Sequence, residues 1–162
     1  MSKILKNQYL GTAKADSLKI RIPLEKLIKY DESLDYHYLK VCEETGEIEK
    51  EFKDEAKSYD IEGVPLKVGI AKRVRTGKTF EDYLYILINS KHVGKWYFKG
   101  LDLETICIIW QRIIDLNIIE IEWIDFLNYS IPTDIDIKID YELPMDEYKE
   151  MSSGFLGTMF KG

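Results

Sequence analysis

Aspartate and isoleucine alternate near the C-terminal end of the chain, in the segment 132–143. In an extended strand, side chains two residues apart share a face, so Asp134, Asp136 and Asp140 lie together and the isoleucines point the other way. Aspartate is a poor strand former, so several on one face need a reason. Same-face carboxylates roughly 6.5–7 Å apart can converge on Mg²⁺ or Mn²⁺. The pattern allows a divalent metal site; the alternative is a solvated face on which Lys138 pairs with the carboxylates.

Two tyrosines, Tyr141 and Tyr148, follow the aspartates. A tyrosine hydroxyl can attack a phosphodiester as a nucleophile, and a bound cation would stabilise the charge on the pentacovalent phosphorus. Glu120 or Glu122, on the strand expected beside the aspartates, could supply a third carboxylate. Tyr141 and Tyr148 are therefore candidate catalytic nucleophiles beside a candidate site for the cofactor Mg²⁺ or Mn²⁺.

A basic segment surrounds a predicted hairpin turn earlier in the chain. Lys72, Arg73, Arg75 and Lys78 could contact the phosphates of DNA. Exposed charge on an ordinary hairpin explains the same residues without a ligand. Gly77 and Lys78 do not belong to the phosphate-binding loop of nucleotide hydrolases, because the glycine required five residues before Gly77 is replaced by Lys72.

The composition indicates one globular domain. Of 162 residues, 45% are hydrophobic and 32% charged, which suits a full core and excludes a disordered chain. The net charge of −6 does not favour non-specific binding to nucleic acid, although local basic patches can exist within an acidic total. We expect a flexible N-terminal arm over residues 1–15, one domain over 16–152 and a flexible tail over 153–162.

The sequence also bears on the compartment. No apolar run is long enough to cross a membrane, and the first residues do not resemble a signal peptide. Cys42 and Cys107 lack Cys-x-x-Cys spacing and are expected as free thiols in a reducing environment. We therefore expect a cytoplasmic protein without membrane contact.

Hydrophobic periodicity predicts an α+β fold. Alternating or continuous apolar runs predict strands at 16–24, 64–73, 83–89, 118–123 and 132–140. Leu103–Leu116 repeats apolar residues at spacings of three and four, which indicates one long amphipathic helix with Asp102 as its N-cap. The economical pairing joins the last two strands as a hairpin. The predicted architecture is a mostly antiparallel sheet with this helix packed on one face.

The strand sequences Asp16–Leu24 and Pro132–Asp140 carry a family resemblance. They resemble phage and plasmid replication initiation proteins of the filamentous-phage gene II/X type, which open with an Asp-Ser/Thr-Leu-x-Ile/Leu-x-Ile-Pro strand. Those proteins also carry a Thr-x-x-Asp-x-x-x-Asp strand after an amphipathic helix, which maps here onto Thr133, Asp136 and Asp140. The resemblance implies rolling-circle initiation, in which a tyrosine nicks one DNA strand with the help of a metal and stays linked to the 5′ phosphate.

Two classes of function follow from these patterns. The first is a replication-associated DNA-binding domain in the host cell cytoplasm, either catalytic or a shortened non-catalytic relative of rolling-circle initiators. The second is a non-enzymatic phage accessory or inhibitor protein that binds a basic protein partner through an acidic face, or a virion component. The placement of the carboxylates discriminates between them, since convergence beside a tyrosine favours the enzyme and dispersal over a surface favours the binding protein.

Overall fold

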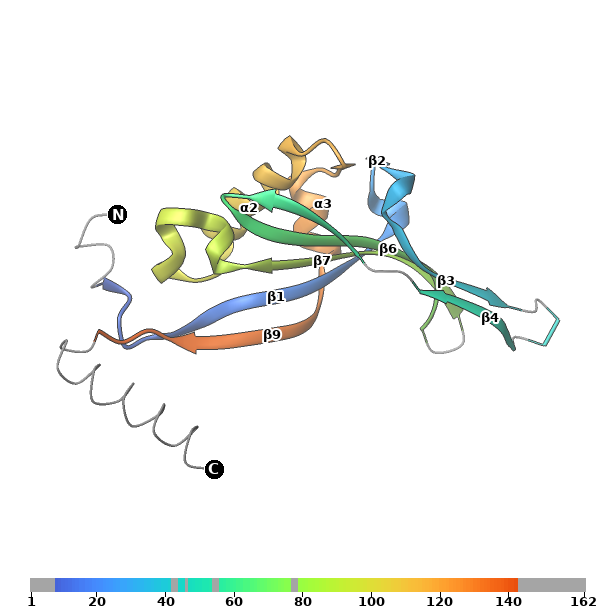
Figure 1. The fold of residues 1–162 in the computed structure, drawn as a ribbon, viewed down its shortest axis with the longest axis horizontal. Helices are drawn as coiled ribbons and strands as arrows, with labels where there is room; N and C mark the ends of the chain where they lie inside the picture. Colours follow the sequence, from blue (N-terminus) through green and yellow to red (C-terminus); the bar gives the residue numbers. More distant parts are fainter. Residues whose placement is uncertain (1–7, 42–43, 46, 54–55, 77–78, 143–162) are drawn as a thin grey trace, which may run out of the picture.

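The computed structural model describes residues 8–41, 44–45, 47–53, 56–76 and 79–142. Within these residues the chain is an α+β fold with a mostly antiparallel sheet, as predicted, but the helical part consists of several segments and not of one long helix (Figure 1). The strands are β1 (Ala13–Pro23), β2 (Lys29–Tyr30), β3 (Asp35–Val41), β4 (Ile48–Lys53), β5 (Lys57–Ile61), β6 (Val64–Thr76), β7 (Thr79–Asn89), β8 (Ile119–Glu120) and β9 (Ile131–Ile139). The helices are α2 (Leu103–Asp115), α3 (Trp123–Tyr129) and the 3₁₀ segments η1 (Leu24–Lys26), η2 (Glu32–Leu34) and η3 (Ser90–Lys99).

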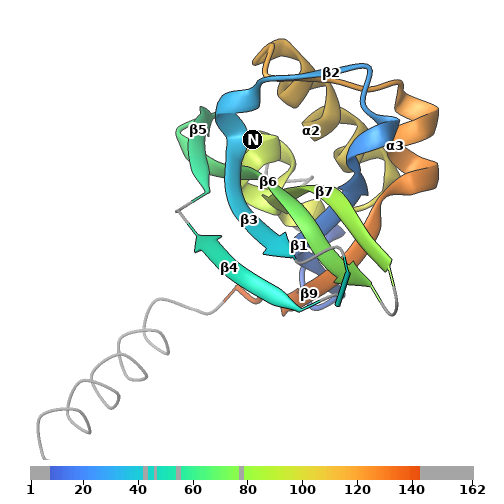
Figure 2. The ribbon, with the colours of Figure 1, turned by 90° about the vertical axis from the view of Figure 1, so that its right-hand side faces the viewer.

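The main sheet has the strand order β4-β3-β6-β7-β1-β9, and β5 pairs with the first part of β6. The β3–β6 pair is parallel and the other pairs are antiparallel. Among the described residues β9 pairs with β1 alone, so it is an edge strand. In the perpendicular view of Figure 2, α2 and α3 lie together on one side of the molecule and β9 lies at the opposite margin.

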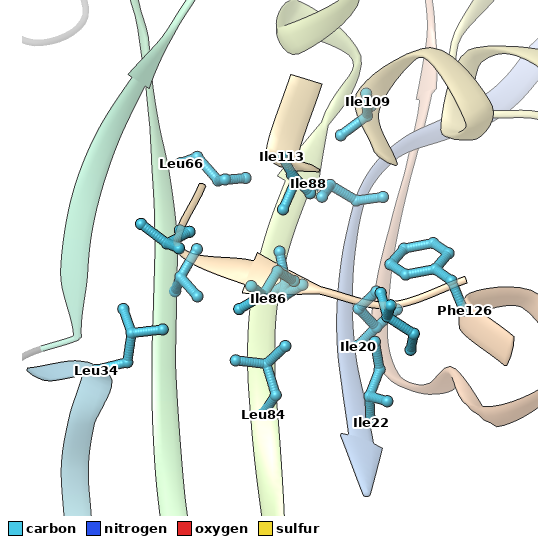
Figure 3. Packing of buried hydrophobic residues seen from close by; sticks show 14 of the residues in the cluster. Ile20, Ile22, Leu34, Leu66, Leu84, Ile86, Ile88, Ile109, Ile113 and Phe126 are labelled. Carbon is cyan, nitrogen blue, oxygen red and sulfur yellow. The ribbon is translucent and has the colours of Figure 1, made fainter. Parts of the chain in front are cut away.

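Alternate residues of the central strands build the hydrophobic core. Ile20 of β1 lies opposite Ile86 of β7, and Ile86 lies opposite Val68 of β6. Ile109 of α2 and Phe126 of α3 cover this face of the sheet (Figure 3). All five side chains are at most 2% exposed. Each burial of this kind contributes about 1.5–3 kcal/mol, so these contacts fix the position of both helices on the sheet.

Helix α2 begins where the sequence predicted. The Asp102 carboxylate accepts a hydrogen bond of 2.9 Å from the Thr105 backbone N–H, and the Thr105 hydroxyl accepts one of 2.8 Å from the Asp102 N–H. This reciprocal capping satisfies two backbone donors at the start of the helix. The helix ends at Asp115, and Asn117 follows with a φ of 55°, a conformation that asparagine tolerates better than most residues.

The predicted strand at 118–123 is wrong beyond Glu120, because Trp123 begins α3. Trp123 and Phe126 lie one helical turn apart and their ring centroids are 5.9 Å apart, while Trp110 of α2 lies 5.4 Å from Trp123. This aromatic cluster favours the helix over an extended strand. The predicted hairpin with the aspartate strand is also wrong, since β8 pairs with β2 and β9 pairs with β1.

The N-terminal part of the described chain is more ordered than the sequence predicted. Strand β1 begins at Ala13, inside the segment expected to be a flexible arm, and Ala13 pairs with Ile139 of β9. Residues 1–7 and the expected tail at 153–162 lie outside the described residues.

Candidate functional site

The carboxylates of β9 contact cations and a hydroxyl of the same chain. Asp136 accepts a hydrogen bond of 2.5 Å from the Ser17 hydroxyl of β1. Asp140 forms ion pairs with Lys14, at 3.1 Å, and with Lys138, at 3.8 Å. The β1–β9 pairing creates these contacts, because it places Ser17 opposite Asp136 and Lys14 opposite Lys138. The predicted salt-bridged arrangement around Lys138 is therefore present.

Lys138 is the centre of this polar network. Its ammonium lies 2.9 Å from the Asp16 carboxylate, 2.9 Å from the Ser90 hydroxyl and 3.2 Å from the centroid of the Tyr97 ring. Ser90 in turn donates a hydrogen bond of 2.5 Å to Asp16. Burial raises the pKa of the Asp16 carboxyl, but the hydrogen bonds from Ser90 and Lys138 and the charge of Lys138 outweigh it, so this pKa lies below its ordinary value.

The exposure of the two faces of β9 is the reverse of the usual pattern. Ile135, Ile137 and Ile139 are 50%, 64% and 46% exposed. On the opposite face the side chains of Lys138 and Asp140 are only 12% and 18% exposed, whereas Asp134 and Asp136 are exposed. The isoleucine face of this edge strand is thus in contact with water while the C-terminal end of the charged face packs against the rest of the chain, so the apolar face is available to a partner.

Of the other predicted catalytic and metal-binding residues, those that the structure describes are exposed to solvent. Tyr141 is 70% exposed and Asp134 is exposed, whereas Tyr148 lies outside the described residues. Glu120 lies on β8 and Glu122 precedes α3, and neither is on a strand beside β9. In the part of the chain that the structure describes, no group of three or more His, Cys, Asp or Glu side chains is placed to hold a metal ion.

A second polar cluster lies on the outer face of the sheet, which we define as the side of β1, β6 and β7 that points away from the core. It carries Lys19, Arg21, Lys67, Tyr83 and Tyr85, which alternate with core-facing residues of the same strands, and Tyr83 is itself only 3% exposed. The guanidinium carbon of Arg21 lies 4.7 Å from the centroid of the Tyr83 ring, and the ammonium of Lys19 lies 5.8 Å from that of Tyr85. Both distances are in the range of cation–π attraction.

Arg21 has an unsatisfied hydrogen-bond donor. Its Nε atom is buried and has no acceptor among the described residues. Buried donors are nearly always paired, so an isolated one calls for an explanation. The guanidinium lies over the Tyr83 ring, and an anionic oxygen would reach the enclosed Nε donor once the side chains around it move apart. Arg21 is therefore suited to contact a phosphate or a carboxylate.

The predicted basic hairpin continues the same strand as Lys67. Lys72 is half-buried on β6, and Arg73 and Arg75 lie on β6 toward its end. Lys78 lies outside the described residues. Three of the four residues predicted to contact nucleic acid therefore lie on β6.

A surface depression lies elsewhere, where β1 and β7 meet η1 and α3. It has a volume of about 850 Å³. It is lined by Pro23, Leu24, Glu25, Lys26, Tyr30, Glu81, Asp82 and Tyr129. The ammonium of Lys26 lies 4.4 Å from the centroid of the Tyr129 ring. No residue of the predicted sites lines this depression.

Sequence reasoning did not assign a functional role to Lys19 or Arg21, although the signal was present. Both alternate with isoleucines in the first predicted strand, so their common face could have been read directly. The partners of Lys138 gave no such signal. Asp16 and Ser90 reach it only through the pairing of distant segments.

Comparison of the chain with protein-family models, with curated proteins and with solved structures gives no match. In the described part of the chain, no helix is both long and apolar enough to cross a membrane.

Proposed function

We propose that this protein is a replication-associated DNA-binding domain that holds single-stranded DNA on the outer face of its sheet. The observation that carries the proposal is Arg21, a cation stacked on Tyr83 with a buried Nε donor that lacks an acceptor in the described residues. A phosphate oxygen would satisfy that donor with a charge-assisted hydrogen bond.

The neighbouring residues support the same ligand. Proteins that bind single strands combine cations that follow the phosphates with aromatic rings on which bases stack. Lys19 and Lys67 are exposed on the outer face, and both lie opposite Leu87 of β7. The half-buried Tyr85, two residues before Leu87, lies opposite Arg21.

Within this function, the contacts of the β9 carboxylates support a non-catalytic relative of rolling-circle initiators. A metal site would need the carboxylates of Asp136 and Asp140 to turn toward one cation. Asp136 instead accepts a hydrogen bond from Ser17, and Asp140 is ion-paired with Lys14. Releasing both groups would break the polar contacts between β1 and β9. Metal-assisted nicking by Tyr141 is the competing version, and a cleavage assay separates the two.

The DNA proposal is tested by fluorescence anisotropy with a labelled single-stranded oligonucleotide over a range of salt concentrations. Arg21→Lys keeps the charge but removes the Nε donor, so we expect affinity to fall about fivefold or more while the salt dependence is retained. For Lys19→Gln we expect the slope of log K against log salt to decrease in magnitude by about 0.7.

The matched control is Lys29→Gln, which removes an exposed cation from β2, outside the main sheet. We expect wild-type affinity for this variant. If Lys29→Gln and Lys19→Gln lost equal amounts of DNA affinity, binding would depend on the total charge of the protein. If Arg21→Lys bound DNA with unchanged affinity, the outer face would be rejected as the DNA site.

A second candidate function rests on the depression at η1. Glu25, Glu81 and Asp82 line it together with Lys26, Tyr30 and Tyr129, so its wall is aromatic and carries more acidic than basic groups. Such a wall is complementary to a lysine- or arginine-rich protein segment, as expected for an accessory protein with a basic partner. Titration calorimetry with a lysine-rich peptide tests it, and Glu25→Gln should weaken any binding that occurs there.

A further inference from the structure

We propose that two copies of this chain pair through their β9 strands, antiparallel and centred on Ile137, to form one continuous sheet. β9 lies at the margin of the sheet in both views, with β1 as its strand neighbour among the described residues (Figures 1 and 2). Its isoleucines are about half exposed, as noted above. This inference concerns self-association and stands apart from DNA binding.

The hydrogen bonds around β1 reveal which backbone groups of β9 face outward. The Ala15 carbonyl accepts a hydrogen bond of 2.8 Å from the Leu101 N–H, so it points away from β9. Ala15 lies opposite Ile137, which makes this a non-hydrogen-bonded antiparallel pair. The N–H and C=O of Ile137 therefore point to the open edge. By alternation, the same holds for Ile135 and Ile139.

Contacts at both ends of β9 agree with this assignment. The Asp140 carbonyl accepts a hydrogen bond of 2.8 Å from Gly11, which precedes β1, so the Asp140 backbone faces β1. The Lys19 carbonyl accepts a hydrogen bond of 3.2 Å from the Thr133 hydroxyl and thus faces β9, where Asp134 is its register partner. The charged residues of β9 accordingly bond inward and the isoleucines outward.

The sequence of β9 is complementary to itself about Ile137. In an antiparallel pair with this centre, Ile137 lies opposite Ile137 of the partner subunit and Ile135 lies opposite Ile139 of the partner subunit. Asp136 then lies opposite Lys138 of the partner subunit, and Asp134 lies opposite Asp140 of the partner subunit. The second pair carries like charges, but Asp140 is ion-paired with Lys14 of its own chain. A centre at Asp136 or Lys138 would place two identical charged residues directly opposite each other at the axis, which is unfavourable. The outward backbone groups of the isoleucines therefore favour a centre at an isoleucine, and the opposition of Asp136 and Lys138 supports Ile137.

An inward-pointing lysine often protects an edge strand from pairing with another chain. Lys138 does not have this effect on β9. Its ammonium is bound to Asp16 and Ser90 of its own chain and its side chain is 12% exposed. Asp136 is likewise held by Ser17. The polar side chains that flank Ile137 are turned toward their own chain and leave the backbone edge accessible to a second strand.

The pairing also determines how the two copies face each other. A two-fold axis perpendicular to the sheet keeps equivalent faces on one side, so the isoleucine side chains of both copies form one row of cross-strand contacts. The outer faces of both copies then lie on the opposite side of the same sheet.

Sedimentation velocity of the full chain over a concentration series tests the proposal. We expect a concentration-dependent dimer for the wild type. Ile137→Pro removes an outward N–H without breaking a bond to β1, and Ile137→Lys places a charge in the row. Each should raise the dimer dissociation constant about tenfold or more. Ile124→Lys is the matched control, since Ile124 is 60% exposed on α3, and it should associate like the wild type.

Amide hydrogen exchange by NMR supplies a residue-specific readout. We expect the amides of Ile135, Ile137 and Ile139 to exchange more slowly as protein concentration rises, while those of Asp136 and Lys138 do not change. A wild-type protein that is monomeric at every concentration overturns the proposal. So does a dimer that persists in Ile137→Pro, because its interface must then lie on another surface.

Discussion

Replacing Lys138 by methionine tests whether the charged face of β9 is a structural element. Methionine keeps most of the apolar stem beside Tyr97 but removes the ammonium that joins Asp16 and Ser90. Asp16 would keep its hydrogen bond from Ser90 and lose its cation. The substitution therefore isolates the charge of Lys138 with little change in packing volume.

The expected loss of stability follows from the exposure of Lys138 and Asp16. A hydrogen bond to a charged group contributes about 1.5–3 kcal/mol when it is shielded from water. Lys138 is 12% exposed, but the Asp16 side chain is 33% exposed, so solvent screens part of the attraction. We expect a loss of about 2 kcal/mol, which corresponds to a urea midpoint lower by about 1 M for a slope near 2 kcal/mol/M.

Urea unfolding followed by circular dichroism measures this loss, with Lys29→Met as the control. Lys29 is exposed on β2, and its replacement should change stability by less than about 0.5 kcal/mol. A double-mutant cycle with Asp16→Asn should give a coupling energy of about 1 kcal/mol or more. If Lys138→Met and Lys29→Met had equal stability and the coupling were zero, the network would not hold β9 to β1.

The pH dependence of stability provides a second check on this network. Because the pKa of Asp16 is lower in the folded protein than its ordinary value of 3.8, Asp16 stabilises the fold above that value. That contribution is lost as the pH falls below 3.8 and through the folded-state pKa. The acid-side loss should be smaller in Lys138→Met than in the wild type.

Four further measurements follow from the structure. Asp102→Ala should lower the free energy of unfolding by about 1 kcal/mol in urea titrations, because it removes the N-cap of α2. Burial lowers the pKa of His92 despite its hydrogen bond to Pro65, so stability should decrease as the pH falls from 6.5 toward the folded-state pKa, as thermal melts at constant ionic strength would reveal. Phe126→Ala should cost about 3–5 kcal/mol, since its side chain is 2% exposed in the core, and an unchanged urea midpoint would contradict that packing. Single-stranded DNA incubated with the protein and Mn²⁺ should stay intact on a denaturing gel, and cleavage that Asp136→Ala abolishes would establish the nicking version instead.

Local signals account for the elements that the sequence predicted well. The strand at 64–73 and the helix at 103–116 appear close to their expected bounds as β6 and α2. Asp102 has the predicted capping role because its partner, Thr105, is three residues away. These features depend on side-chain periodicity and short-range hydrogen bonds, both of which can be read from a few neighbouring residues.

Features that depend on distant segments were not predictable in the same way. The alternation at 118–123 is short, and contact of Trp123 with Trp110 favours a helix there. The strand partner of β9 is β1, from the opposite end of the chain, and no local pattern indicates that choice. The partners of Asp136 and Asp140 follow from this pairing, so the sequence predicted a group of carboxylates without the cations that neutralise them.

The exposed isoleucines of β9 follow from where the packing elements end. A period of two determines which residues share a face, but the neighbouring elements determine which face is buried. Helices α2 and α3 cover the central strands, while η3 supplies Ser90 and Tyr97 to the charged face of β9. An apolar edge strand with outward-facing backbone groups favours association, and natural sheets usually protect such edges. Because the polar groups of this strand bond inward, its exposed edge is better explained as an interface than as a solvated surface.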